Sequence, residues 1–178
     1  GLTDDLLGFR GKRNKVWVLF LLALPIALLT RDTTLSLIFI EIELGWIYTF
    51  VFAPLYIMVV ANMVNMHAGY NGLEGGLVLI MLIFAAIKSY LVNNSYFVYL
   101  ILPLLGALAA FMYYNKYPSK VFPGNIGAFL IGSGLGGYLI LSNIEFFGVI
   151  ILIPHIINFL LWIYWTRIMH REPHVKFA

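Results

Sequence analysis

Three separate positions in this 178-residue sequence carry oxygen side chains of the kind that bind hard metal ions. An acidic pair, Asp4 and Asp5, stands near the start. Asn65 lies in a polar break between two apolar runs, and Asn125 opens another apolar run. Carboxylate and amide oxygens with cations beside them suit Mg²⁺ bound to a pyrophosphate. Taken alone, an adjacent acidic pair is more typical of a solvated loop, so only the combination is informative.

A cluster of basic residues follows the acidic pair, namely Arg10, Lys12, Arg13 and Lys15. Such a cluster attracts anionic lipid headgroups and orients a chain in the bilayer. The same cations could hold a phosphate group beside the oxygen ligands. Both interpretations stay open from the residues alone.

The polar break spans residues 62–76 and is rich in glycine and asparagine. A bilayer core excludes bare amides and irregular backbone unless they line a wet cavity or are buried in protein. The break therefore predicts a polar site at the membrane edge. The sequence has no cysteine, Walker motif or dinucleotide fingerprint, which excludes thiolate metal sites and cysteine nucleophiles and gives no sign of those nucleotide-binding folds.

Long apolar segments must position these residues, because 62% of the chain is hydrophobic and only 11% is charged, against about 25% charged in soluble domains. A bilayer is crossed by about 20 mostly apolar residues. We therefore predict an all-α, polytopic bundle of transmembrane helices that forms one membrane-embedded domain. The predicted spans are residues 16–31, 45–65, 74–91, 95–114, 125–142 and 145–166.

The segments around these spans carry further patterns. Residues 38–44 alternate with period two, which predicts a short extended hairpin whose Glu41 and Glu43 are solvated rather than catalytic. Small residues recur along 125–137 and predict a face where helices pack closely. His155 lies inside an apolar run, so we expect it to pack or hydrogen-bond against a neighbouring helix.

Six spans place the loops alternately on two sides, and the basic residues divide unevenly between them. Nine fall on one side and two on the other, the nine being Arg10, Lys12, Arg13, Lys15, Lys116, Lys120, Arg167, Arg171 and Lys176, and the two Arg31 and Lys88. By the positive-inside rule, the side with nine is cytoplasmic. Asp4, Asp5, Asn65 and Asn125 share that side, so the candidate site is predicted to face the cytoplasm and the hairpin the opposite side.

Three motifs, in order and at consistent spacing, resemble the polyprenyl-phosphate sugar-1-phosphate transferases of glycosyltransferase family 4. They are Asp4-Asp-Leu-Leu-Gly-Phe-Arg10 with Lys15, Asn62-Met-Val-Asn65 running into Ala68-Gly-Tyr-Asn-Gly-Leu-Glu-Gly-Gly76, and Tyr114-Asn-Lys-Tyr-Pro-Ser-Lys-Val-Phe-Pro-Gly-Asn125. The branch they resemble most is that of the UDP-GlcNAc–dolichyl-phosphate GlcNAc-1-phosphate transferases, and the bacterial peptidoglycan translocase is more distant. The family has more spans than this chain, so the resemblance implies further spans before Asp4 and after Ala178.

The resemblance implies roles for individual residues. Asp4, Asp5 and Lys15 would form the catalytic group, with the acidic pair organising the lipid phosphate and Lys15 beside the phosphates. Asn65 and Asn125 would bind Mg²⁺, or Mn²⁺ in its place. The substrate-binding residues would be Asn71, Gly72 and Glu74 in the nucleoside loop, Phe122 against the uracil, and Arg171, His174 and Lys176 toward the sugar and phosphates.

The implied reaction transfers GlcNAc 1-phosphate from UDP-GlcNAc to a polyprenyl or dolichyl phosphate and releases UMP. It would be the first step of lipid-linked oligosaccharide assembly for N-glycosylation. The expected partners are the nucleotide sugar, the lipid and the membrane, with no nucleic acid, and a homodimer is left open. An isoleucine-rich, cysteine-free composition favours an archaeal plasma membrane over the endoplasmic reticulum.

One position departs from the family pattern, which has aspartate where this chain has Asn125. Asparagine keeps a carbonyl oxygen at the same reach but loses the negative charge. Either this branch uses a neutral ligand or the protein is a catalytically weakened homologue. The alternative from another class is a transporter or other non-enzymatic polytopic protein, although no internal repeat of the kind found in many transporters is visible.

Overall fold

The computed structural model describes residues 12–30, 32–37, 40–67, 70–93 and 96–169, and helices make up most of these ranges. In chain order the elements are α2 (Lys12–Ala27), β1 (Thr34–Ser36), β2 (Glu41–Glu43), a π-helical segment η1 (Tyr48–Phe52), α3 (Ala53–Asn65), α4 (Leu73–Asn93), α5 (Tyr96–Asn115), α6 (Gly124–Leu141), α7 (Glu145–Ile151), α8 (Ile153–Ile163) and a second π-helical segment η2 (Tyr164–Ile168).

A helix occupies the position of every predicted span. Four helical segments are long and apolar enough to cross a membrane, namely Tyr48–Asn65, Leu73–Val92, Tyr96–Asn115 and Gly124–Leu141. The sixth predicted span is a helix pair bent by 64°, and the first is a shorter helix whose apolar part is Trp17–Ala27. The all-α, multi-pass membrane architecture is therefore confirmed. The span predicted over 145–166 is a helix pair broken at residue 152.

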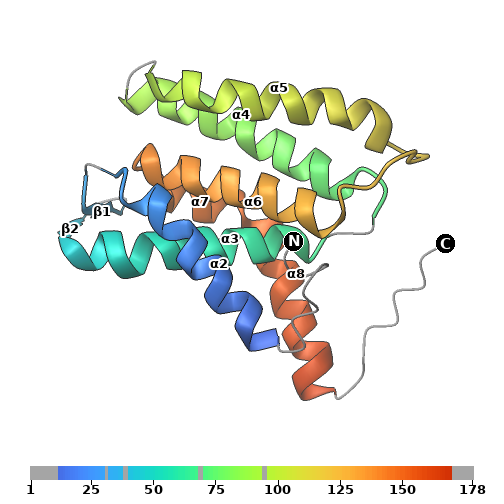
Figure 1. Cartoon of the computed structure of the whole chain (residues 1–178), viewed down its shortest axis with the longest axis horizontal. Coiled ribbons are helices and arrows are strands. Elements are labelled where there is room, and N and C mark those ends of the chain that lie inside the picture. The colour runs from blue at the N-terminus through green and yellow to red at the C-terminus, as the bar shows by residue number, and fades with distance from the viewer. Residues whose placement is uncertain (1–11, 31, 38–39, 68–69, 94–95, 170–178) are drawn as a thin grey trace.

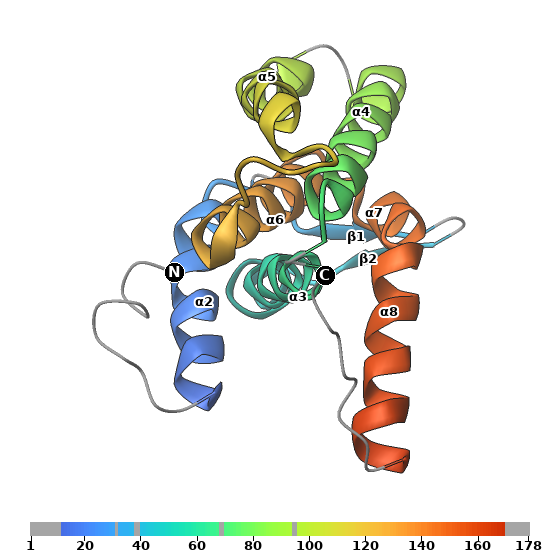
Figure 2. The same ribbon diagram turned by 90° about the vertical axis from the view of Figure 1, so that its right-hand side faces the viewer.

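The helices α3 and α6 form the centre of the bundle (Figures 1 and 2). A Cβ atom added at Gly132 would lie 2.8 Å from the Cα atom of Ala61, and one added at Gly136 would lie 3.1 Å from the Cα atom of Ile57. Only glycine permits this approach, because any side chain would meet backbone atoms of α3. The small-residue face predicted over 125–137 is thus a packing face.

The pair α4 and α5 covers one side of this centre, while α2 and α8 lie on opposite sides of α3 (Figures 1 and 2). Leu82 of α4 and Leu135 and Leu139 of α6 are fully buried in the main apolar cluster. Many large apolar side chains instead point outward, such as Leu91 at 73% exposure. An outer surface of this kind is stable in hydrocarbon rather than in water.

The predicted hairpin is present. β1 and β2 pair antiparallel in the register Thr34 to Glu43 and Ser36 to Glu41, and Glu41 and Glu43 are exposed as expected. The side-chain amide of Asn143 donates to Asp32 Oδ2 at 2.9 Å and so ties the hairpin to the loop between α6 and α7.

The bend between α7 and α8 falls at Leu152, the residue shared by the two helix ends, with Pro154 in the first turn of α8. Proline lacks an N–H donor and clashes with the carbonyl four residues before it, so it favours a break at this point. Pro25 and Pro103 lie inside continuous helices, so the proline alone does not determine the bend.

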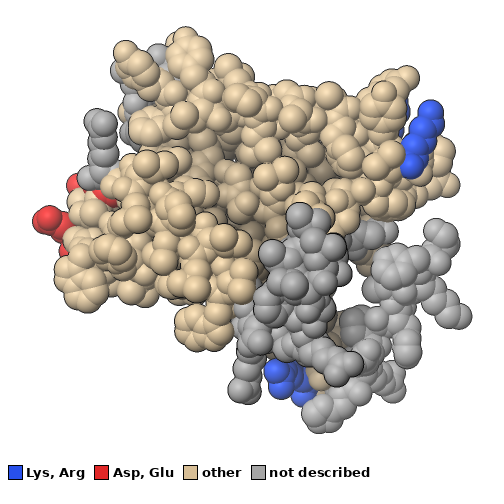
Figure 3. Space-filling view, in the orientation of Figure 1, with Lys and Arg blue, Asp and Glu red and all other residues tan. Residues whose placement is uncertain are grey.

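On the face that Figure 3 shows, the charges separate along the bundle. Carboxylates gather at the hairpin, while lysine and arginine side chains lie at the opposite end of the long helices and at the far end of the bent pair. Lys88 of α4, which lies near the hairpin, does not follow this pattern. We call the two ends the hairpin end and the Asn65 end, since α3 ends at Asn65. This arrangement matches the charge asymmetry of the loops in the sequence.

Candidate functional site

Packing of α3 against α6 places the two predicted metal ligands at the same end of the bundle. Ile57 contacts Gly136, and Ala61, four residues later in α3, contacts Gly132, four residues earlier in α6. The two helices therefore pack antiparallel. Continued by one turn, this register sets Asn65 opposite Ala128, with Asn125 in the preceding turn of α6. The glycine face therefore fixes the separation of the two asparagines.

Asn65 has the features of an oxygen ligand. Its Oδ1 atom is buried and has no hydrogen-bond partner among the described residues. Asn62, three residues earlier, instead donates its amide to the Met58 carbonyl at 2.8 Å within its own helix. A buried carbonyl oxygen without a donor is costly unless a cation or a ligand donor meets it. Asn65 therefore fits a site for a hard cation.

Asn125 lies in the first turn of α6 and is exposed, directly after Gly124, whose φ is +60°. No group of three or more His, Cys, Asp or Glu side chains that could hold a metal is found within the described ranges. The described oxygen groups at this end are the amides of Asn65 and Asn125 and the carboxylate of Glu74, while Asp4 and Asp5 lie outside the described residues.

The predicted nucleoside loop packs against the end of α5. Gly72 has a φ of +71°, and a Cβ atom there would lie 3.3 Å from the Cα atom of Lys116. A Cβ atom at Gly75 would lie 2.7 Å from Met112 Sδ and 3.5 Å from Asn115 Oδ1. The backbone conformation favours glycine at position 72, while a side chain at position 75 would require the Met112 side chain to move.

Two buried side chains beside this loop carry oxygen atoms that have no hydrogen-bond partner among the described residues. Glu74, in the first turn of α4, is 1% exposed, and neither of its carboxylate oxygens has a partner among the described residues. The Oδ1 atom of Asn115 is also buried and unpaired within that part of the chain. Acceptors placed in this way can receive hydrogen bonds from the N–H and O–H groups of a ligand.

The Asn115 side chain also shapes the next loop. Its Nδ2 group donates to the carbonyl of Val121 at 2.8 Å, and the Ser119 hydroxyl donates to the same carbonyl at 3.0 Å. These bonds fix the segment that carries Phe122, which is 49% exposed. In the sequence, Asn115 is part of a motif but has no assigned role. Its place as a polar residue at the end of an apolar helix was the signal that could have identified it.

The structure brings six predicted site residues to the Asn65 end through successive helix ends and loops, namely Asn65, Asn71, Gly72, Glu74, Phe122 and Asn125. Asp4, Asp5, Arg171, His174 and Lys176 lie outside the described residues. Lys15 belongs to α2, but its side chain is not among those that the structure describes. The roles assigned to all these residues remain predictions.

A pair of histidines lies next to Asn65. His67 Nδ1 is 3.4 Å from the Met63 carbonyl oxygen, and its ring centroid is 4.3 Å from that of His155 in α8. Burial lowers the pKa of His67 below its ordinary value of 6.5. Packing of His155 against a neighbouring helix was expected, but the identity of its partner was not visible in the sequence.

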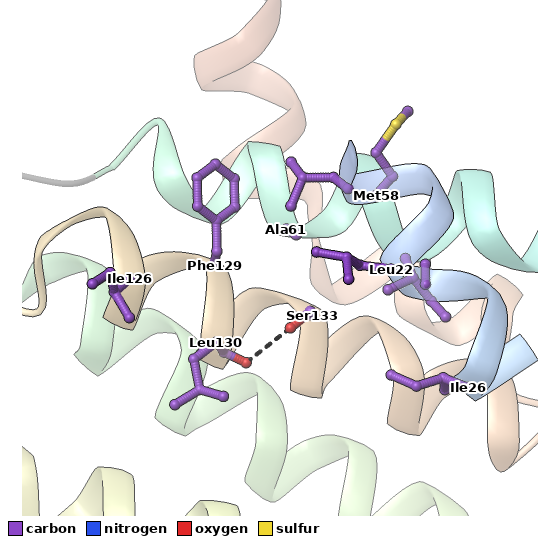
Figure 4. A pocket seen from close by; sticks show the side chains of 11 residues that line it. Leu22, Ile26, Met58, Ala61, Ile126, Phe129, Leu130 and Ser133 are labelled. Carbon is purple, nitrogen blue, oxygen red and sulfur yellow. Dashed lines mark hydrogen bonds between the residues drawn. The ribbon is translucent and has the colours of Figure 1, made fainter. Parts of the chain in front are cut away.

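An apolar pocket of about 360 Å³ lies between α2, α3 and α6 (Figure 4). Among the described residues of its lining, Ser133 is the one polar residue, and its hydroxyl donates to the Leu130 carbonyl at 3.2 Å. The pocket reaches Ile126, the neighbour of Asn125. Its chemistry suits a hydrocarbon chain and not a nucleotide.

Residues 1–143 match the sequence profile described as Glycosyl transferase family 4. The chain is 32% identical over 164 residues to a protein of Saccharolobus solfataricus and 29% identical over 172 residues to one of Sulfolobus acidocaldarius, with 90% of this chain covered in each case. Both are provisionally named UDP-N-acetylglucosamine–dolichyl-phosphate N-acetylglucosaminephosphotransferase. The alignments cover 51% and 50% of those proteins, so the chain spans about half their length.

A phospho-N-acetylmuramoyl-pentapeptide-transferase of Carboxydothermus hydrogenoformans is 36% identical over 107 residues, which is 60% of this chain and 33% of that protein. The match to the family profile extends over the acidic pair, the Asn65 segment and the loop that ends at Asn125. These are the segments that carry the predicted site. The chain, an integral membrane protein with several spans, therefore belongs to glycosyl transferase family 4.

Proposed function

We propose that this chain forms part of a membrane enzyme that transfers a sugar 1-phosphate, with GlcNAc 1-phosphate favoured, from a UDP-sugar to a polyprenyl or dolichyl phosphate. One observation carries the proposal. Oxygen acceptors of Asn65, Glu74 and Asn115 that have no partner among the described residues gather at a single end of an apolar helix bundle. The names of its relatives point in the same direction.

In the proposed reaction, an oxygen of the lipid phosphate attacks the β-phosphorus of the UDP-sugar. A new P–O bond forms, the bond from the β-phosphorus to the bridging oxygen breaks, and UMP leaves with that oxygen. Phosphoryl transfer of this kind depends mainly on positioning and on neutralising charge. The last proton of a phosphate monoester has a pKa of about 6, so Asp4 and Asp5 would orient the lipid phosphate more than act as bases.

The nucleoside would bind at the loops that end α5 and begin α4. Uracil presents an N–H donor, and ribose presents hydroxyl donors, which match the unpaired oxygens of Glu74 and Asn115. Phe122 offers an exposed aromatic face on which a base can stack. Asn71 is exposed beside Gly72 and can bond the ring carbonyls.

Asn65 and Asn125 would hold a divalent cation together with the diphosphate and the acidic pair. Mg²⁺ bound there would neutralise phosphate charge in the manner general to phosphoryl-transfer enzymes. Because both amides are neutral, metal affinity would depend more strongly on the substrate's own oxygens than in a site with a carboxylate at position 125. Lys15 would add positive charge beside the phosphates.

The lipid acceptor would arrive from the bilayer. The pocket between α2, α3 and α6 is apolar and reaches the neighbour of Asn125, so we place the isoprenoid chain in it. Its phosphate would then lie near the Asn65 end, where the diphosphate is held. By the positive-inside asymmetry, this end faces the cytoplasm, in a plasma membrane of the archaeal type.

The test is release of UMP from UDP-GlcNAc by the full-length protein in native membranes, with and without polyprenyl phosphate and Mg²⁺ or Mn²⁺. Activity should require the lipid and a divalent cation. Asn65→Ala should lower turnover by at least about 100-fold, as expected when a charge-stabilising group is lost. Asn62→Ala is the matched control, because the Asn62 amide donates to the Met58 carbonyl within its own helix.

UMP release without the lipid would contradict the proposal. So would full activity in Asn65→Ala. No UMP release by a folded protein, with activity restored by Asn125→Asp, would favour a catalytically weakened homologue instead.

A further inference from the structure

A second pocket lies at the hairpin end, opposite the candidate active site. It has a volume of about 490 Å³. Its walls come from the hairpin, the last turns of α4, the loop before α7, and α7 itself. Figure 2 shows α7 between α4 and the two strands, so three separate parts of the chain meet here.

The polar part of the lining combines a cation with oxygen acceptors. Lys88 of α4 is half-buried, and no described residue forms a hydrogen bond or ion pair with its ammonium group. Asn143 uses its Nδ2 group on Asp32 and Ser36, while its Oδ1 atom is buried without a partner among the described residues. Glu41 of β2 adds an exposed carboxylate.

These groups call for complementary chemistry in one ligand. An ammonium group without a partner near hydrocarbon needs an anion, and a phosphate supplies one with strong acceptor oxygens. Asn143 Oδ1 is buried without a donor among the described residues, and a hydroxyl group can supply one, while the exposed Glu41 carboxylate can accept from another. A free phosphate carries more negative charge at pH 7 than a phosphodiester, so Glu41 would repel it more strongly.

The remaining lining is apolar. Phe146, Phe147 and Ile150 of α7 and Val92 of α4 border the polar groups. Ile150 is 46% exposed and Val92 is 54% exposed on helices whose outer surface faces lipid. A hydrocarbon chain attached to the headgroup could therefore continue from the pocket along these helices into the bilayer.

We propose that this pocket binds a phospholipid whose headgroup carries one phosphodiester and free hydroxyls, of the phosphatidylglycerol type, from the leaflet at the hairpin end. The phosphate lies on Lys88, the headgroup hydroxyls donate to Asn143 Oδ1 and Glu41, and the acyl or isoprenoid chains follow α7. The lipid joins α4, α7 and the hairpin. The proposal does not depend on the transferase activity, because it concerns the opposite end of the bundle.

The experiment uses the purified full-length protein in detergent and counts bound lipids by native mass spectrometry. The probe is dioleoylphosphatidylglycerol. Dioleoylglycerol has the same chains without phosphate, dioleoylphosphatidylmethanol keeps the phosphate without free hydroxyls, and glycerol 1-phosphate has the headgroup without chains. We expect tight binding of the first, weaker binding of the methanol lipid, and little binding of the other two.

Lys88→Met should weaken binding of dioleoylphosphatidylglycerol by about 10- to 100-fold, the range for loss of one charge-assisted hydrogen bond. Lys88→Arg keeps the positive charge and should retain binding. Lys116→Met removes a lysine at the opposite end and should not change it.

Equal binding by the wild type and Lys88→Met would overturn the proposal, as would equal binding of dioleoylglycerol. Saturation by glycerol 1-phosphate at the same concentration would show a site for a soluble phosphate and would also overturn it. One outcome is that Lys88→Met lowers the melting temperature even without added lipid. In that case the deciding measurement is the binding of dioleoylphosphatidylglycerol against that of dioleoylphosphatidylmethanol by Lys88→Arg. Retained preference for free hydroxyls supports the proposal, and its loss refutes it.

Discussion

The contact between α3 and α6 is so close at Gly132 that one added methyl group should disturb the candidate site. A Cβ atom at this position would lie 2.8 Å from the Cα atom of Ala61 and 3.0 Å from the Cβ atom of Val64. Ordinary contact begins at 3.4 Å, so the two helices must separate locally by about 0.6 Å. The Ala61 atom is backbone, so no side-chain rotation can relieve the contact.

Two opposing terms set the stability of Gly132→Ala. Overpacking of a well-packed interface costs roughly 1–3 kcal/mol, while replacing glycine by alanine in a helix gains about 1 kcal/mol. We therefore expect a net loss of about 0–2 kcal/mol. The effect on catalysis should be larger than this loss implies. Asn65 lies one turn beyond Ala61, and a misplacement of about 1 Å can reduce a rate by about 100-fold, so a shift of about 0.6 Å predicts a loss of about tenfold.

Gly106→Ala is the matched control, because a Cβ atom at Gly106 would meet no atom within 4 Å. It gains the same helix propensity without the clash, so it should keep full activity and a melting temperature at or above that of the wild type. UMP release in native membranes and thermal unfolding in detergent measure both quantities. Turnover of Gly132→Ala equal to that of Gly106→Ala would refute the view that this interface positions Asn65.

Three further predictions concern other parts of the bundle. Tyr48→Phe should lower stability by about 1–3 kcal/mol, because the Tyr48 hydroxyl donates to the buried Glu145 carboxylate. Tyr99→Phe is the control, because Tyr99 is 66% exposed, and it should not lower stability. Equal melting temperatures of the two variants would contradict this. Burial lowers the pKa of His67, so the unfolded chain binds the proton more readily and the melting temperature should fall as pH drops through about 6.5; His67→Gln should flatten this dependence, and an unchanged slope would exclude His67 as its source. Ser133→Phe fills the apolar pocket and should raise the KM for polyprenyl phosphate while leaving the KM for the UDP-sugar unchanged; an effect on the UDP-sugar alone would exclude that pocket as the lipid seat.

Hydropathy predicted where the helices lie because a span of about 20 apolar residues leaves few alternatives in this sequence. It could not predict their shape. Four prolines fall within apolar helical stretches, and the chain continues through Pro25, Pro54 and Pro103 but bends by 64° next to Pro154. The outcome depends on whether packing compensates for the missing hydrogen bond, which is a tertiary property and not a local one.

The glycines of α6 were predictable as a class but not by role. Their spacing indicated close packing, yet only the structure shows that Gly132 and Gly136 meet the backbone of α3, whereas Gly134 meets the side chain of Leu104. A clash with a flexible side chain can be relieved by rotation, and a clash with backbone cannot. The positions that set the spacing of Asn65 and Asn125 are therefore a subset that a single sequence does not distinguish.

Two buried glutamates show most clearly where sequence reasoning ends. Glu74 and Glu145 each begin an apolar helix and are each 1% exposed. Glu145 accepts a hydrogen bond from Tyr48, 97 positions earlier, and the Tyr56 hydroxyl donates to its backbone carbonyl at 3.0 Å. No described residue offers Glu74 a donor.

Because a buried carboxylate without donors is costly, the two residues cannot have the same role. Glu145 satisfies part of its need within the fold and joins α7 to the start of the Tyr48–Asn65 span. Within the described part of the chain, Glu74 has no donor, and neither does the Oδ1 atom of Asn115 at the neighbouring glycine loop. We infer that Glu74 retains its orphan oxygens for a ligand, since residues that serve only stability are rarely left in such a state. The residue type and the local pattern are the same in both, and only the partners brought in by distant segments separate a structural carboxylate from a binding one.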